Sequence, residues 1–399
     1  MIRHLIKLNW NRKRTNFLMI AEIFFSFLVL FGVCTAVANF YNNYKKPIGF
    51  DYKNVWLMNA YAHETPDAEK RQRLEQMVQR IKALPEVEHV ALGSDNGPYT
   101  RNTWTTTLSK GNIEIAANLV YAQHDAFKDV LKLNMVDGRW FEEGDASSNQ
   151  NPVIITQDAK QKLFGDEPAV GKKIQIGKSD AEPEGTDQLV IGVVEAYKPG
   201  GELDSEAASY FVRTSLADTS EAAHAGVFIR VKDDTNPSFE EQLLKESASV
   251  APGWTLNIRP LEDLRRVYLK EVLLPFIALF IICGFLILNV ALGLFGVLWQ
   301  SINKRYSEIG LRRALGASES SIYRQFLGEV LVLASFGLIL GCFFAVQFPL
   351  LGVLDLPAQV YTLGIVIAVL LIYSLVILCA LYPSRQAAAI HPATALHEE

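Results

Sequence analysis

The chain has 399 residues, of which half are hydrophobic, and its formal net charge is −5. The acidic excess falls outside the basic flanks of the apolar segments, and it argues against nucleic acid as a partner. The four cysteines, Cys34, Cys283, Cys342 and Cys379, lie one in each of four long apolar segments. We therefore expect no disulfide framework and interpret these cysteines as small packing residues.

The four apolar segments predict transmembrane helices at residues 17–43, 271–299, 325–348 and 358–382. Each exceeds the roughly 20 residues that a helix needs to cross a bilayer. A mixed sequence at 44–270 separates the first from the other three. The predicted fold class is therefore an α-helical membrane protein with four transmembrane helices in a one-plus-three layout. A large α+β domain of two lobes lies between the first and second helices.

Basic residues predict the orientation. They cluster in the flank 1–16, which reads as basic and amphipathic, and in the loop 300–324, whereas the loop between the third and fourth helices has none. Because basic loops stay in the cytoplasm, both termini, the loop 300–324 and the segment 383–399 are expected there, with the domain outside. Ala36-Val37-Ala38 resembles a signal-peptidase site, but the apolar run is too long for a signal sequence, and we expect an uncleaved anchor.

The domain reads as alternating short strands and amphipathic helices. Residues Pro66–Leu84 carry apolar side chains at three- and four-residue steps, which predicts a helix, and Pro85 ends it. We predict an inner lobe from about 50–120 and 220–260, close to both membrane attachments. The middle, about 121–219, is predicted to be inserted into it as a second lobe.

Motifs for catalysis or metal binding are weak. The segment Gly165–Lys173 resembles a phosphate loop, but five residues separate its glycines, and Lys173 stands where Ser or Thr is needed. The histidines of the domain, His63, His89, His124 and His224, lack metal-ligand spacing. We expect no catalytic residue, no cofactor and no metal in this chain.

One cytoplasmic segment, Asn303–Ser318, reads as two capped helices around a glycine turn. Ser307 is predicted to cap the first helix, with Glu308 near its positive end, and Gly316 to end it in the left-handed conformation. Ser318 would cap the next helix. The same segment carries Ile309, Gly310, Arg312, Arg313 and Ala317. Two interpretations stay open: a basic amphipathic hairpin resting on lipid headgroups, or a short rigid helix that inserts into a cytoplasmic partner.

Of the polar residues inside the predicted spans, Glu22, Asn289 and Glu329 are the candidates for a functional role. Glu22 and Glu329 lie within about two turns of the cytoplasmic boundary, where we expect snorkelling or pairing with Arg324 or Arg14. Asn289 is expected to hydrogen-bond between helices. A helix over Leu261–Trp299 would be roughly 58 Å long, longer than the bilayer core of about 30 Å, with a possible kink at Pro275.

These motifs resemble a known family. Glu308–Ser318 is similar to the EIG-x-x-[RK]-A-x-GAS signature of FtsX-type permeases, and Tyr382–Leu396 is similar to their C-terminal ending. Within the domain, Gly138–Asp145 and the stretch Val153–Val194 resemble the MacB-like periplasmic core domain. The residues that carry this second likeness are Gly138, Arg139, Phe141, Asp145, Phe164, Gly165, Gly171 and Gly192.

The resemblance implies a permease that transmits motion rather than passing solute. It implies a bacterial inner membrane, a second permease protomer (a copy or a paralogue), and a separate ABC ATPase subunit that binds ATP and Mg²⁺. The sequence itself shows no phosphate loop and no LSGGQ-type signature. Three functions are open: efflux of an antibiotic, peptide or similar substrate with a periplasmic adaptor and an outer-membrane channel, lipoprotein release, or regulation of cell-envelope enzymes. The large domain argues against the third.

Overall fold

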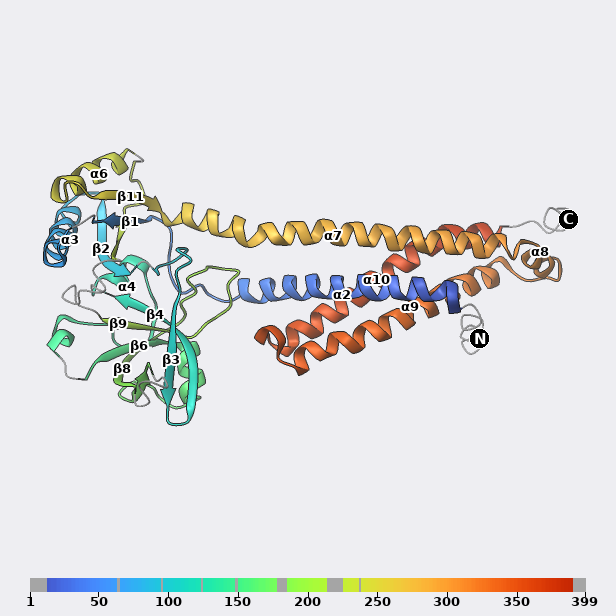
Figure 1. Ribbon diagram of the computed structural model, residues 1–399, viewed down its shortest axis with the longest axis horizontal. Helices are drawn as coiled ribbons and strands as arrows, with labels where there is room; N and C mark the ends of the chain where they lie inside the picture. The colour runs from blue at the N-terminus through green and yellow to red at the C-terminus, as the bar shows by residue number, and fades with distance from the viewer. Residues whose placement is uncertain are drawn as a thin grey trace. The chain divides into compact units, whose positions relative to one another are not determined.

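The computed structural model describes residues 13–62, 65–94, 96–122, 125–147, 150–177, 185–213, 225–236 and 238–389. The chain divides into two compact units. One comprises Met1–Asn42 with Val272–Glu399, and the other comprises Asn43–Glu271. Both are drawn in Figure 1.

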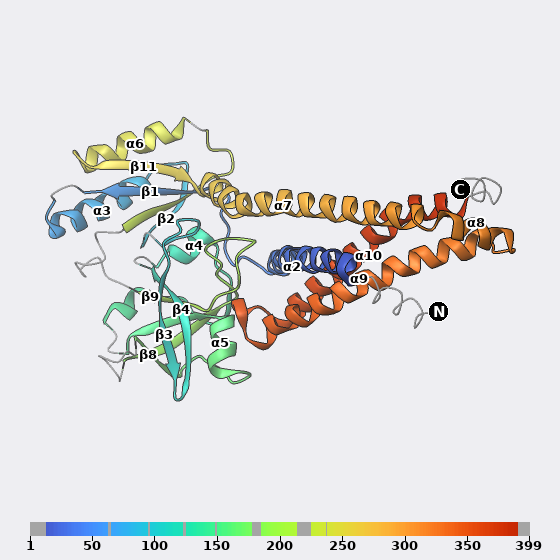
Figure 2. The ribbon, with the colours of Figure 1, turned by 45° about the vertical axis from the view of Figure 1, so that its right-hand side comes forward.

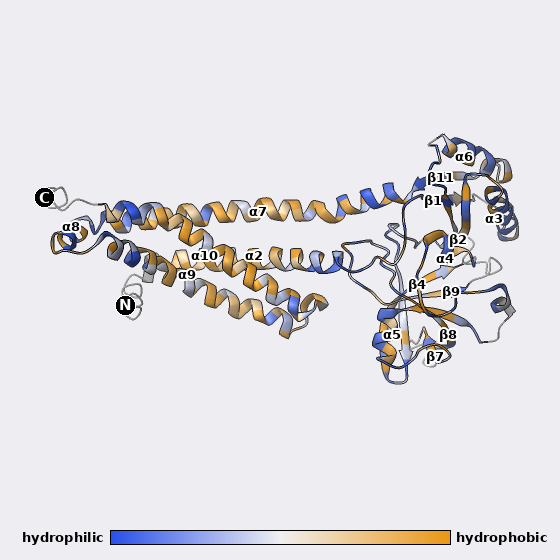
Figure 3. Cartoon of the chain, turned by 180° about the vertical axis from the view of Figure 1, so that it is seen from behind, coloured by the Kyte–Doolittle hydropathy of each residue, from blue (hydrophilic) through white to orange (hydrophobic). Residues whose placement is uncertain are grey.

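Within the described residues, the helical unit contains four long apolar helices. They are α2 (Lys13–Tyr44), the apolar part of α7 (Leu261–Asn303), α9 (Glu319–Leu350) and α10 (Ala358–Ala388). By length and composition, each could cross a membrane, and Figure 3 shows the hydrophobic colour running along all four. This confirms the one-plus-three layout. The helices extend beyond the predicted spans, and α7 continues through Pro275.

Close helix packing holds this unit together. Figures 1 and 2 show α9 and α10 side by side, joined through the short helix η3 (Val353–Asp355). Gly337 and Gly341 of α9 lie against Ile23 and Phe27 of α2, so close that an added Cβ would meet them at 2.9 and 2.3 Å. Small residues at this spacing let helices approach closely in a membrane. All four cysteines pack in or against this core, as expected.

The domain unit begins with a four-stranded antiparallel sheet in the order β11-β1-β10-β2. Its strands are β1 (Val55–Tyr61), β2 (Val87–Ser94), β10 (Ala225–Val231) and β11 (Thr255–Pro260). Two helices, α3 (Asp67–Lys82) and α6 (Phe239–Val250), cover one face. Helix α3 confirms the helix predicted from the apolar spacing and ends where Pro85 follows.

The remaining strands form a closed barrel. They are β3 (Trp104–Lys110), β4 (Ile113–Ala122), β6 (Pro152–Thr156), β7 (Lys173–Ile176), β8 (Thr186–Val194) and β9 (Ser209–Arg213). Their order is β4-β3-β7-β8-β6-β9, and β4 pairs with β9 to close the ring. Strand β5 (Met135–Gly138) pairs with the end of β8, beyond the part that pairs with β7, and α5 (Gln157–Phe164) packs its apolar face into the barrel core.

The barrel corrects the predicted division into lobes. Strands β3 and β4 were assigned to the inner lobe, about 50–120, but they pair with β7 and β9 of the barrel. Among the described residues, a single pair, Gly93 with Ala122, joins β2 to β4. The change between sheets therefore falls between β2 and β3, about 20 residues earlier than predicted. A core shared by both sheets and by α4 (Phe127–Leu131) fills the space between them.

Candidate functional site

The predicted coupling segment forms the short helix α8 (Tyr306–Ala314) between α7 and α9. Ser307 does not cap it, which contradicts the prediction. The cap position is Arg305, which makes no side-chain cap bond, and Ser307 lies inside the first turn. The amide of Ile309 donates to the carbonyl of Arg305 at 2.9 Å, so the helix already begins before Ser307. Glu308 does lie in the first turn, where a negative charge suits the helix dipole.

The end of α8 is built as predicted. Gly316 has a φ of +96°, in the left-handed region that favours glycine. The amide of Ala317 donates to the carbonyl of Arg312 at 2.9 Å, and that of Gly316 to the carbonyl of Arg313 at 3.1 Å. These two bonds define a Schellman motif. The hydroxyl of Ser318 then accepts from the amide of Ser321 and caps α9, so the turn has a fixed geometry on both sides.

A small apolar cluster fixes the inner face of α8. Ile309 is buried together with Ile302 of α7, Ile322 and Phe326 of α9, and Ala387 of α10. Gly310 is buried beside it. Three of the four long helices therefore contact α8 through one cluster. A displacement of α8 would have to move their ends as well, because well-packed side chains transmit strain.

A chain of polar contacts reinforces this cluster. Arg305 forms an ion pair with Glu329 of α9 at 3.0 Å, and each side chain is only 11% exposed. The side-chain NH₂ group of Gln325 donates to the carboxylate of Glu329 at 3.2 Å. The side-chain oxygen of Gln325 accepts from the guanidinium of Arg312 at 2.9 Å. Among the described side chains, Glu329 pairs with Arg305 rather than with the predicted Arg324. The side chain of Arg14, the other predicted partner, lies outside the described residues, so that pairing stays a prediction.

Sequence reasoning missed Arg305 and Gln325 as members of this network. The available signal was the position of Glu329 ten residues into an apolar helix, which requires a nearby cation. Arg313 adds a second tie to α9 through Glu319 at 2.9 Å.

The outer face of α8 is open. Leu311 is 51% exposed and Leu315 is 80% exposed, and Glu308 and Arg312 pair beside them on the surface. Exposed apolar side chains flanked by charges are typical of a surface that contacts another protein or lipid headgroups.

Glu22 and Asn289, the other two candidate residues inside the predicted spans, have different contacts from those of Glu329. Glu22 of α2 lies beside Gly293 of α7, whose added Cβ would meet a carboxylate oxygen at 2.9 Å. Asn289 was expected to bond between helices, but its side chain donates to the carbonyl of Phe285 in its own helix at 2.8 Å. That bond satisfies the amide locally, because a carbonyl four residues back is within reach in any helix.

The motif residues of the domain have structural roles. Gly138 has a φ of +69°, and an added Cβ would lie 2.2 Å from the carbonyl oxygen of Ile191. Arg139 holds Asp145 with two bonds of 2.7 Å, and Asp145 also accepts from the amide of Glu142. The guanidinium lowers the pKa of Asp145, and the same bond raises the pKa of Arg139. Phe141 is buried beneath this turn.

The remaining motif positions complete the barrel. The backbone of Gly192 lies so close to Arg139 that a Cβ atom added at Gly192 would be only 2.3 Å from the carbonyl oxygen of Arg139. A residue with a side chain would therefore clash here. Phe164 is buried in the barrel core, and Gly165 ends α5 with a φ of +59°. The amide of Gly171 donates to Val190 at 2.8 Å, so the segment that resembles a phosphate loop is a turn that joins α5 to β7.

The loop between β8 and β9, which the sequence analysis did not single out, contacts the end of α2 and the first turns of α7. The Lys198 side chain is fully buried and donates to the carbonyls of Asn43 and Glu202 at 2.9 and 3.2 Å. Glu202 pairs with Arg265 of α7 at 2.7 Å. Lys46 pairs with Glu206 at 2.7 Å. The loop between β8 and β9 therefore holds both the end of α2 and the start of α7.

Within the described residues, no group of three or more His, Cys, Asp or Glu side chains is placed to hold a metal ion. Of the four histidines considered above, only His89 lies inside the described ranges; His63, His124 and His224 fall outside them.

Comparison with known proteins identifies the class. The model of the MacB-like periplasmic core domain matches residues 17–246, and that of the FtsX-like permease C-terminal matches residues 279–392. Because the first match covers more than half of the chain, the chain belongs to the MacB/FtsX-type family of ABC transporter permeases. It is a multi-pass membrane protein whose large domain has the MacB-like periplasmic fold.

Individual relatives are distant. The macrolide export ATP-binding/permease protein MacB 1/2 of Paracoccus denitrificans is 26% identical over 62% of this chain and 36% of its own length. MacB of Bartonella quintana is 24% identical over 80% of this chain and 49% of its own length. The chain thus spans half or less of the curated relatives it matches. The periplasmic region of MacB from Actinobacillus actinomycetemcomitans superposes with a TM-score of 0.38 at 17% identity, covering 55% of this chain and 93% of that structure.

Proposed function

We propose that this chain is the permease subunit that couples a separate ABC ATPase to work in the periplasm. In this proposal α8 inserts its exposed face, Leu311 and Leu315, into the ATPase. The observation that carries it is the contrast between the two faces of α8. The inner face is fixed by the Ile309 cluster and the Glu329 network, whereas the outer face is apolar and open.

The same contacts provide a route for motion. Arg305 lies at the turn between α7 and α8, so a push on α8 acts on the end of α7 and, through Glu329, on α9. Helix α7 is continuous over 43 residues, about 64 Å at 1.5 Å per residue. At its other end Arg265 holds Glu202, and the Lys198 loop passes the movement to β8 and β9. Substrate does not need to cross the bilayer in this mechanism.

We also propose an orientation in the membrane and a set of partners for this chain. Both termini and α8 lie in the cytoplasm, and the domain lies in the periplasm of a double-membrane bacterium. ATP and Mg²⁺ bind to the partner ATPase, and this chain is not itself catalytic. A second permease protomer completes the pair, with an adaptor and an outer-membrane channel on the periplasmic side. We favour efflux over lipoprotein release because the relatives reported above are macrolide export proteins.

The test is a double substitution on the open face, Leu311→Asp with Leu315→Asp. Membrane levels should be normal, since neither side chain belongs to the buried cluster. Co-purification of an ABC ATPase should be lost, and cells should become as sensitive to exported compounds as a deletion strain. Ile113→Asp, another exposed apolar position, serves as the control and should change neither. Full ATPase binding by the double variant would refute the proposal.

A further inference from the structure

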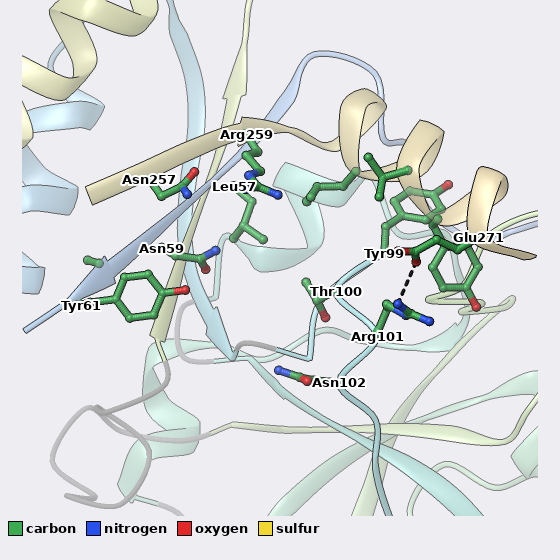
Figure 4. A pocket seen from close by; sticks show the side chains of 14 residues that line it. Leu57, Asn59, Tyr61, Tyr99, Thr100, Arg101, Asn102, Asn257, Arg259 and Glu271 are labelled. Carbon is green, nitrogen blue, oxygen red and sulfur yellow. Dashed lines mark ion pairs between the residues drawn. The ribbon is translucent and has the colours of Figure 1, made fainter. Parts of the chain in front are cut away.

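One face of the four-stranded sheet is left open beside the first turns of α7. Along β1 and β11, side chains alternate between the two faces. Met58 and Ile258 are buried under α3 and α6. On the opposite face, Asn59 and Asn257 are direct partners across the two strands, and Arg259 follows two residues along β11. Figure 4 shows these three side chains on one side of the sheet, next to Leu57.

This face forms the floor of a pocket of about 370 Å³. One wall is the loop Tyr99–Asn102, and the other is the side of α7 that carries Leu264, Val267, Tyr268 and Glu271. The volume lies within the range of about 300–1,000 Å³ that is typical of small-molecule sites. Apolar walls with a few converging polar groups are also typical of such sites.

The polar groups on the floor are free to bind. Asn59, Asn257 and Arg259 make no side-chain hydrogen bond or ion pair with any described residue. The other cation of the pocket, Arg101, is already neutralised by Glu271 at 2.8 Å. Of the described residues that line the pocket, Arg259 is therefore the cation that remains available, and it is flanked by two carboxamides that can both donate and accept.

The loop wall carries a backbone signature that is common at binding sites. Tyr99 and Arg101 both adopt positive φ, +62° and +65°, although neither is glycine. Such conformations are unfavourable for residues other than glycine and cluster at ligand sites, where the surrounding structure enforces them. The amide of Tyr99 donates to the carbonyl of Pro199 at 2.8 Å, which fixes the loop from behind.

We propose that this pocket binds a small amphipathic anion, with its carboxylate or phosphate on Arg259 and its apolar body against Leu264 and Val267. Arg259 matches a planar carboxylate or a phosphate through paired N–H donors. Asn59 and Asn257 would hold an amide or hydroxyl group of the same molecule. The site lies within the domain and does not depend on the proposed coupling to an ATPase.

The probe for the test is 4-benzoylbenzoate, a small apolar carboxylate that attaches covalently to nearby C–H bonds under light. The full chain in phosphatidylcholine nanodiscs is labelled over a range of probe concentrations, and the attachment sites are read by peptide mass spectrometry. We expect saturable labelling of the peptides that carry Tyr99–Asn102 or Leu264–Glu271. The neutral 4-benzoylbenzamide should label them at least about fivefold less, because it lacks the charge that Arg259 recognises.

Variants at the floor separate recognition from folding. Arg259→Gln should reduce labelling at least about fivefold, while Arg259→Lys, which keeps the charge, should reduce it less. Arg80→Gln is the matched control, because Arg80 is an exposed arginine on α3, on the covered side of the same sheet. It should label like the wild type.

Competition identifies the natural chemistry. Protection by N-acetyl-leucine indicates a peptide-like carboxylate, whereas protection by hexyl phosphate indicates a phosphate headgroup. Protection by neither compound would overturn the proposal. So would equal labelling by the neutral amide, unchanged labelling of Arg259→Gln, or attachment only outside the pocket.

Discussion

Arg305 and Glu329 form an ion pair of 3.0 Å with both side chains only 11% exposed, and it joins the turn before α8 to the third turn of α9. Losing one partner leaves the other charge buried and uncompensated, which costs more than the pair contributes. We predict that Arg305→Gln or Glu329→Gln alone lowers the free energy of unfolding by about 3 kcal/mol.

The double variant Arg305→Met with Glu329→Leu should recover most of that loss, because both charges are removed together. Its thermal unfolding in detergent, compared with that of each single variant, gives the coupling energy. We expect the stable double variant still to lose transport-linked activity, since the ion pair that joins the start of α8 to α9 is gone while the Arg313–Glu319 pair remains. Additive losses in the double variant would contradict the assignment.

Substitution of Gly316 tests whether the Schellman turn sets the orientation of α8. At a φ of +96°, a Cβ meets no neighbour within 4 Å, so Gly316→Ala should cost only the backbone strain of about 1 kcal/mol. Gly177 is the matched control, with a φ of +78° and equally open space. We predict similar small losses of stability in both variants, but weakened ATPase binding only for Gly316→Ala. Equal binding by the two would show that the turn does not aim the helix.

Glu308→Lys separates the two interpretations of α8. It removes the pair with Arg312 and places a positive charge in the first helical turn, costing about 0.3–1 kcal/mol. If α8 inserts into an ATPase, activity in cells should fall while membrane levels stay normal. If α8 rests on anionic lipid, the added charge should be harmless. Growth in the presence of an exported compound, at matched protein levels, measures the difference.

The bond between Arg139 and Asp145 predicts a pH dependence. Arg139 lowers the pKa of Asp145 below its ordinary value of 3.8, so the folded state prefers the ionised carboxylate. The contribution to stability is therefore present above about pH 4 and is lost as the pH falls through the lowered pKa. Asp145→Asn should cost about 1–2 kcal/mol at pH 7, near the low end because Arg139 is 45% exposed.

Thermal unfolding of the full chain at pH 7, 5 and 3 tests this. The gap between wild type and Asp145→Asn should be the same at pH 7 and 5 and should narrow at pH 3. A gap that does not narrow on acidification would mean that the charge of Asp145 is not what stabilises the turn.

Several features could be predicted from the sequence because they depend on local rules. The length of the apolar segments alone predicts the four membrane helices. The glycine and serine at the end of the coupling segment predict the turn at Gly316 and the cap at Ser318. The cap at Ser307 was predicted by the same rule and was wrong, because packing of Ile302 and the pairing of Arg305 start α8 earlier.

Other features depend on pairing between distant residues, which no local pattern reveals. The assignment of β3 and β4 to the barrel rests on their pairing with β7 and β9, about 70 and 90 residues away in sequence. The burial of Lys198 depends on carbonyl groups of residues that the loop meets only after folding. The pocket near Arg259 requires β1, β11, α7 and the Tyr99 loop together.

The most direct test of the central claim places a photo-crosslinking amino acid, p-benzoylphenylalanine, at Leu315, the exposed apolar residue that caps the C-terminal end of α8. The same group at Ile113, exposed at the β3–β4 turn, is the control. After irradiation of intact host cells, the account predicts that Leu315 forms an adduct with an ABC ATPase, identified by mass spectrometry, and that Ile113 does not. Adducts of Leu315 with lipid alone, or with periplasmic proteins, would contradict it.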